Sequence, residues 1–285
     1  MEKKEGVEKK EGDGSFTRRS VLTGSAALLV GGALGAGISS VGASPAPTEA
    51  PAGAPPLPWK YVNLDPLETG RLAFRFYEKG GCGYATYRAF LSQFKEKVGY
   101  PWTTLPDTMM THAAAGYGGH GTLCGALGGT SLILNLVAYS EKDQVYRQMI
   151  DRLYWWYAAQ EFPTDRFDDI CAFPKQVRAK AMSPLCHTSV SKWTLAAGAE
   201  VTSKGKKDRC AKVSGVVAYI TALALNEYFD GKWKPPVWNP SKEVEHCVKC
   251  HGPDDWQHTK TGMNQQQGHM ECLMCHDDHT KKASK

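Results

Sequence analysis

The sequence predicts an all-α fold, a helical domain followed by a C-terminal, largely irregular segment. Apolar residues recur at spacings of three and four through the middle of the chain, and no alternating strand pattern of useful length occurs. Of the nine Cys and nine His, four Cys and six His lie within residues 246–285. With 285 residues and 42% hydrophobic composition, the chain can bury a sizeable core, which excludes a small disulfide scaffold and global disorder.

Residues 1–43 resemble a twin-arginine export signal. Arg18 and Arg19 precede a weakly apolar, Gly- and Ala-rich run, and Val41-Gly42-Ala43 supplies the small residues that a signal peptidase accepts. The apolar run falls short of the ~20 residues that span a bilayer, so we expect no stable membrane anchor. The sequence therefore predicts a periplasmic protein. Residues 44–59 are rich in Pro and Ala and are expected to form an extended linker that packs against nothing.

Residues 60–232 are expected to form the helical domain. Asp65 can cap a first helix, which a Gly80-Gly81 pair should end, and a second apolar face then runs to Gly99. Further helical patterns cover residues 122–139, 141–159, 184–197 and 207–229. The charge run from Lys204 to Lys212 is interpreted as solvated surface.

Five cysteines lie in this domain, and four of them fall near the start of an expected helix. At such positions the free backbone amides and the helix dipole stabilise a thiolate or an anionic cluster. Four cysteines from four helices could converge on an iron-sulfur cluster, which is held by four thiolates. The spacing equally permits two disulfides with Cys171 left over, or free thiols buried as small hydrophobes.

Two copies of Cys-x-x-Cys-His close the chain, and this is the attachment signature of c-type haem. Cys247 and Cys250 would bind one porphyrin covalently and Cys272 and Cys275 a second, which predicts two haems per chain. His251 and His276 would be the proximal iron ligands. Residues 233–285 contain few aliphatic side chains, so the haems are expected to serve as the core of this dihaem module. The rival interpretation is a structural zinc site made by the four Cys, which the His after each pair disfavours.

Four further histidines are candidates for the distal side of the two irons: His246, His258, His269 and His279. The short connection between the motifs keeps the two haems in or near contact. These features predict a periplasmic electron carrier rather than an enzyme. The alternative is a small haem reductase that keeps one axial position open. A net charge of +5 without basic and aromatic clusters excludes nucleic acid as a partner and leaves redox proteins of the periplasm.

The chain resembles the split-Soret cytochrome c family, whose members are dihaem proteins. The resemblance lies in the segments GGCGYAT (80–86), GTLCGAL (121–127), SPLCH (183–187) and SKW (191–193) and in both haem motifs. The CGA helix is also similar to a broader family of cysteine-rich redox proteins. The chain departs from the pattern at Thr194, where a Cys often follows the Trp.

This resemblance implies a helical subunit and a homodimer whose haems gather at one end. It implies parallel stacked haems with two His each, one of which the other subunit can donate. It also implies an iron-sulfur site, whose cysteines would be Cys82, Cys124, Cys186 and Cys210.

Overall fold

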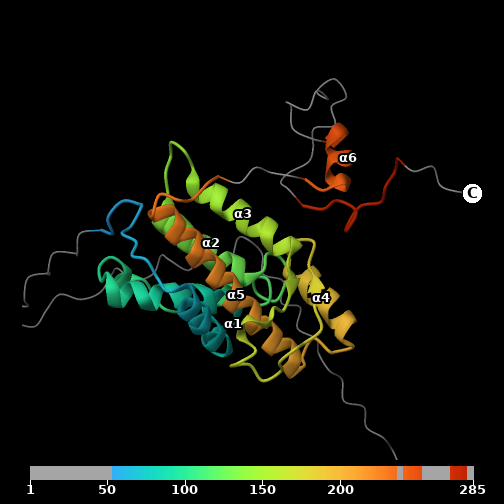
Figure 1. Cartoon of the computed structure of the whole chain (residues 1–285), viewed down its shortest axis with the longest axis horizontal. Helices are drawn as coiled ribbons and strands as arrows, with labels where there is room; N and C mark the ends of the chain where they lie inside the picture. The colour runs from blue at the N-terminus through green and yellow to red at the C-terminus, as the bar shows by residue number, and fades with distance from the viewer. Residues whose placement is uncertain (1–52, 236–239, 252–269, 281–285) are drawn as a thin grey trace, which may run out of the picture. The chain divides into compact units, whose positions relative to one another are not determined.

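The computed structural model describes residues 53–235, 240–251 and 270–280 (Figure 1). These residues are mostly helical, as predicted. The helices are α1 (Pro66–Lys97), α2 (Gly125–Ala138), α3 (Val145–Ala159), α4 (Cys186–Ala197), α5 (Lys204–Phe229) and α6 (Lys242–His251). Two short strands, β1 (Glu161–Phe162) and β2 (Ala179–Lys180), pair antiparallel, and three 3-10 turns cover Trp102–Thr104, Thr111–Ala113 and Asp165–Phe167. The predicted signal sequence, His258 and His269 lie outside the described residues.

Helix α1 consists of two halves that meet at a kink at Gly81, where the sequence predicts a break between two helices. It begins as predicted, because the Asp65 carboxylate accepts hydrogen bonds from the amides of Leu67 (2.8 Å) and Glu68 (3.2 Å). Gly81 has φ +77°, a conformation that favours glycine, and the backbone leaves the helical conformation at this residue. A Cβ at Gly81 would also lie 2.8 Å from the Cβ of Ala114. The kink places Cys82 at the start of the second half of α1.

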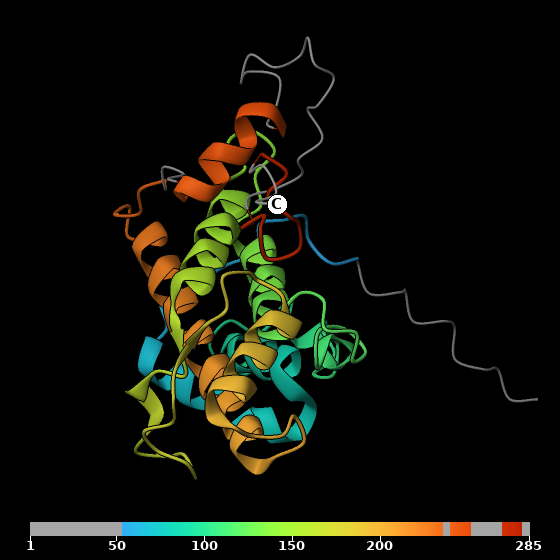
Figure 2. The same ribbon diagram turned by 90° about the vertical axis from the view of Figure 1, so that its right-hand side faces the viewer.

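The helices of the domain pack closely through small residues. Helix α1 contacts α5 and α2 most extensively, while α2, α3 and α5 lie side by side (Figure 1, Figure 2). A Cβ at Gly70 of α1 would lie 2.9 Å from the carbonyl oxygen of Gly215 in α5. A Cβ at Gly129 of α2 would lie 2.5 Å from the carbonyl oxygen of Gly83 in α1. Side chains of ordinary size would therefore hold these helices apart.

The end of the predicted linker is packed against the domain, contrary to the expectation that it contacts nothing. Leu57 is part-buried on the core, and Trp59 is almost fully buried. The Trp59 amide donates to the carbonyl of Leu136 (2.8 Å). The physical reason is that Leu57 and Trp59 are large apolar residues within a Pro-rich segment, and burying them is favourable.

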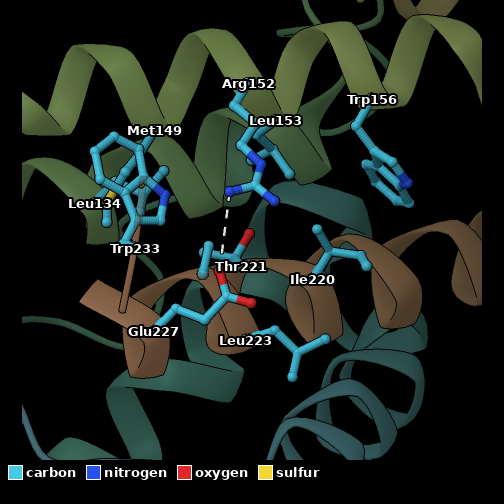
Figure 3. Close-up of a pocket in the computed structure, with 11 residues that line it drawn as sticks. Leu134, Met149, Arg152, Leu153, Trp156, Ile220, Thr221, Leu223, Glu227 and Trp233 are labelled. Carbon is cyan, nitrogen blue, oxygen red and sulfur yellow. Dashed lines mark ion pairs between the residues drawn. The ribbon is translucent and has the colours of Figure 1, made fainter. Parts of the chain in front are cut away.

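A cleft of about 160 Å³ lies between α3 and α5, with Leu134 of α2 at its base. Its lining is mainly apolar, and Arg152 and Glu227 face each other across it at 3.9 Å (Figure 3). None of the cysteines lines this cleft. Within the described ranges, none of the helices combines the length and the apolar character needed to cross a bilayer.

Candidate functional site

Four of the five cysteines of the helical domain lie within electrostatic range of one another: Cys82, Cys124, Cys186 and Cys210. They come from the kink of α1, the residue that precedes α2, the first residue of α4 and the second turn of α5. We call this group the thiol site. The fifth, Cys171, instead contacts the carbonyl oxygen of Asp168 (3.5 Å). None of the nine cysteines is paired in a disulfide in this structure.

An antiparallel bridge between two loops brings the starts of α2 and α4 together. Leu123 pairs with Leu185, and the amide of Cys124 donates to the carbonyl of Pro184 (2.9 Å). The amide of Cys186 donates in turn to the carbonyl of Thr122 (2.7 Å). Both helices therefore begin beside the thiols, with the positive ends of their dipoles toward the site.

The thiols influence one another's ionisation. The hydrogen bond between Cys82 and Cys124, together with burial, raises the pKa of the Cys82 thiol well above its usual value. The same hydrogen bond, assisted by one from the Tyr157 hydroxyl, lowers the pKa of Cys124 to about 6 against the opposing effect of burial. Burial and then the neighbouring thiols raise the pKa of Cys186 to about 12. One thiolate is therefore favourable here, and further thiolates require a cation or a cationic cluster core.

Three side chains that the sequence analysis did not assign to a site surround the thiols. The Tyr77 hydroxyl is hydrogen-bonded to Cys210. The Tyr157 hydroxyl donates to Ser189 Oγ (2.8 Å). Two tyrosines that are far apart in the sequence therefore place their hydroxyls at the thiol site, and no local sequence signal distinguishes them from core tyrosines.

Arg209 is the third of these side chains, and it corrects the interpretation of the charge run as solvated surface. Arg209 is 1% exposed and Lys212 is 0% exposed, although Lys204 and Lys207 are exposed as expected. Both buried cations share the stripe of α5 that carries Val216, at spacings of seven and four. This spacing was the sequence signal that could have predicted the burial of the two cations. A cation on the apolar stripe of a helix is buried and therefore needs a partner.

The thiol site fits a cluster of several irons better than a single ion. Among the residues that the structure describes, no three His, Cys, Asp or Glu side chains are grouped tightly enough to hold one metal ion. In a cluster, however, the thiolates bind different irons and are spaced more widely than around one ion. Four thiols, two helix N-termini and a buried guanidinium form a donor set suited to an anionic iron-sulfur core.

The first terminal motif lies on α6. Cys247 and Cys250 are three positions apart in this helix, one turn from each other, and His251 is its last residue. The ring of His279 is 5.8 Å from the ring of His251, centroid to centroid. His246 Nε2 lies 3.0 Å from Thr280 Oγ1. Of the distal candidates, His279 therefore lies beside the first motif, and His246 lies beside Thr280, the residue that follows His279.

The second terminal motif is a tight turn. The carbonyl of Cys272 accepts hydrogen bonds from the amides of Cys275 (3.1 Å) and His276 (3.1 Å), which brings the motif's residues to one side of the chain. Burial and the nearby Cys247 thiol raise the pKa of Cys272 to about 11. Within residues 240–251 and 270–280, no three His, Cys, Asp or Glu side chains are grouped as they would be around a single metal ion.

Comparison with known proteins gives three matches. Residues 84–223 match the family described as "Putative redox-active protein (C_GCAxxG_C_C)", a range that includes three of the four cysteines of the thiol site. The chain is 30% identical to the split-Soret cytochrome c of Desulfovibrio desulfuricans over 91% of its own length and 94% of that protein. It also matches a solved structure described as a novel iron centre in that cytochrome, with a TM-score of 0.66 and 28% identity over 77% of this chain and 90% of the other.

Proposed function

The chain belongs to the split-Soret cytochrome c family, and from this premise we propose that it is an exported electron carrier with two c-type haems and one iron-sulfur cluster per chain. The observation that carries the proposal is the meeting of four thiols from separate helices in a chain that ends with two Cys-x-x-Cys-His motifs. Haem iron and an iron-sulfur cluster each accept and release single electrons.

The terminal motifs would hold the haems. Each pair of cysteines attaches one porphyrin through thioether bonds, and His251 and His276 bind the two irons on the proximal side. Distal ligands would come from His246, His258, His269 and His279. With both axial positions filled by His, the irons have no open position for a substrate, which favours electron transfer over the reductase alternative.

The thiol site would hold the iron-sulfur cluster, with Cys82, Cys124, Cys186 and Cys210 as ligands. Its polar surroundings support this assignment. The hydroxyls of Tyr77 and Tyr157 lie beside the thiols of Cys210 and Cys124, and a hydrogen bond from such a hydroxyl would stabilise negative charge on a thiolate ligand. The carbonyl oxygen of Ala113 lies 4.0 Å from Cys82 Sγ, so this residue borders the site.

Export and assembly complete the proposal. The twin-arginine signal in residues 1–43 carries folded proteins, and a cluster assembled before export requires such a route. Haem attachment would then follow in the periplasm. We also propose a homodimer, in which an axial His shared between the subunits would tie their two haem modules together.

The test is a cofactor inventory of the full protein purified without oxygen. A pyridine haemochrome assay is expected to give two haems per chain, and iron analysis should find non-haem iron with acid-labile sulfide. Reduced protein should bind no carbon monoxide. An unmodified C-terminal segment in mass spectrometry would reject the haem assignment, and strong carbon monoxide binding would favour the reductase.

Cysteine variants locate the cluster. Cys186→Ala and Cys210→Ala should each lose most of the acid-labile sulfide while both haems remain. Cys171→Ala is the matched control, because Cys171 belongs to the same domain but contacts Asp168 instead of the thiol site. Equal loss of sulfide in all three variants would contradict the assignment of ligands.

A further inference from the structure

Arg209 is a buried cation without a carboxylate partner. Its Nη2 donates to the carbonyl oxygen of Ser189 (3.1 Å) and to Ser189 Oγ (2.7 Å), both neutral acceptors. Its Nη1 points to Cys210 Sγ at 3.8 Å. Among the described residues, Arg209 Nε has no hydrogen-bond partner, and none of the ion pairs includes Arg209.

Lys212, one turn further along α5, is a buried cation that does have a carboxylate partner. It is equally buried, but its Nζ pairs with Asp168 (2.5 Å) and donates to the carbonyl of Phe173 (2.9 Å). A buried charge without a counter-charge is costly, so Arg209 requires an anionic partner. No carboxylate among the described residues fills this role. The anionic groups within its reach are the sulfurs of the thiol site.

We propose that Arg209 is the fixed counter-charge of the iron-sulfur cluster and raises the cluster's reduction potential. This inference rests on the proposed function. One electron, given up by a ferrous haem that becomes ferric, makes the cluster more negative by one charge. A guanidinium at hydrogen-bonding distance from a cluster thiolate stabilises the reduced state more than the oxidised state. Because arginine stays protonated in proteins, this charge is constant across the physiological pH range.

The experiment is a redox titration of the full protein, with the cluster followed by low-temperature electron paramagnetic resonance. At the potential where the wild-type cluster is half reduced, Arg209→Gln should lower the ratio of reduced to oxidised cluster by about tenfold, which is 59 mV for one electron. Arg209→Lys keeps the charge and should stay close to the wild type. Lys207→Gln is the matched control, because it removes one positive charge from an exposed position two residues away.

A second pair of variants keeps the guanidinium in place. Ser189→Asp puts a carboxylate against Nη2 and should neutralise its field, which lowers the potential as Arg209→Gln does. Ser189→Asn introduces a side chain of nearly the same size as Asp but without its charge. It should leave the reduction potential much closer to that of the wild type. This pair decides the question if Arg209→Gln yields no folded protein.

Three results would overturn the inference. One is an unchanged potential in an Arg209→Gln variant that retains its acid-labile sulfide. Another is an equal potential in Ser189→Asp and Ser189→Asn. The third is a wild-type protein without acid-labile sulfide, which defeats the cluster of the proposed function and this inference together. The first two results would leave the proposed function standing, so the two failures are distinguishable.

Discussion

The two cysteine-rich regions of this chain build their sites in opposite ways. The thiol site collects cysteines from α1, α2, α4 and α5, and only the packed helical core holds them near one another. In the C-terminal region each pair of cysteines and its His lie within five consecutive residues, on α6 or in a tight turn. A site of the first kind depends on the fold, whereas a site of the second kind is complete in its local sequence.

The hydrophobic core reflects the same difference. Its buried members run from Trp59 to Leu225, that is, from the last residue of the linker through the helical domain. Val244 and Val248 of α6 are buried but do not belong to this core. The helical domain should therefore be stable without haem, while the C-terminal region should depend on it.

The largest effect is expected in the C-terminal region. Cys247→Ala combined with Cys250→Ala should reduce the haem content from two per chain to one, because no thioether can form at the first motif. Thermal unfolding of the helical domain, followed by far-ultraviolet circular dichroism, should stay within a few degrees of the wild type. A large drop in that transition would show that the two regions are not independent.

Next in size is a change inside the helical domain. Lys212→Met removes a buried cation and leaves the Asp168 carboxylate without its partner. We expect a loss of about 3 kcal/mol in the free energy of unfolding, at the lower end for buried pairs because the Asp168 side chain is 20% exposed. Urea unfolding measures the loss, and haem content should stay at two per chain. A loss of less than about 0.5 kcal/mol in the free energy of unfolding would mean that the Lys212–Asp168 pair behaves as an exposed ion pair in solution.

The sequence was most informative where structure is local. Spacings of three and four predicted the helices from α2 to α5 to within a few residues, and the haem motifs were legible without any fold. The meeting of Cys124 and Cys186 could not be derived, because it depends on the bridge between Leu123 and Leu185, a contact between distant segments. Periodicity locates faces of helices but does not say which faces meet.

One local interpretation held, and one failed for a physical reason that can be named. The Gly80-Gly81 pair was predicted to end a helix, and Gly81 does leave the helical conformation with a positive φ, so α1 consists of two helical halves that meet at a kink. The run from Lys204 to Lys212 was expected to be solvated, yet two of its cations are buried because they occupy the apolar stripe of α5. That interpretation relied on the charged composition of the run, whereas the helical spacing of Arg209 and Lys212 was the better guide to their burial.

A smaller effect should follow from the close packing that positions the thiols. In Gly129→Ala, the new Cβ would lie 2.3 Å from Thr86 Oγ1 and 2.5 Å from the Gly83 carbonyl, so α1 and α2 must move apart. We expect a loss of about 2 kcal/mol in the free energy of unfolding and less acid-labile sulfide per chain. Gly205→Ala is the matched control. Its Cβ would meet nothing closer than 3.8 Å, so the helix should gain about 0.5 to 1 kcal/mol. Similar losses in both variants would contradict the packing argument.

The smallest expected effect is a pH dependence of the free energy of unfolding that arises in the helical domain and not in the C-terminal region. Burial by itself would raise the pKa of Asp168, but hydrogen bonds from Lys212 and from the Lys175 amide outweigh it and lower the pKa below the usual 3.8. The pair therefore stabilises the folded domain above the unfolded pKa and loses this contribution as pH falls through the folded pKa. Wild-type protein should therefore lose more stability than Lys212→Met between pH 5 and pH 3 in urea unfolding. Contributions from the C-terminal region are common to both proteins and cancel in the difference. Parallel pH profiles would therefore assign the acid sensitivity to the haem region and remove Asp168 from the account of the domain's stability.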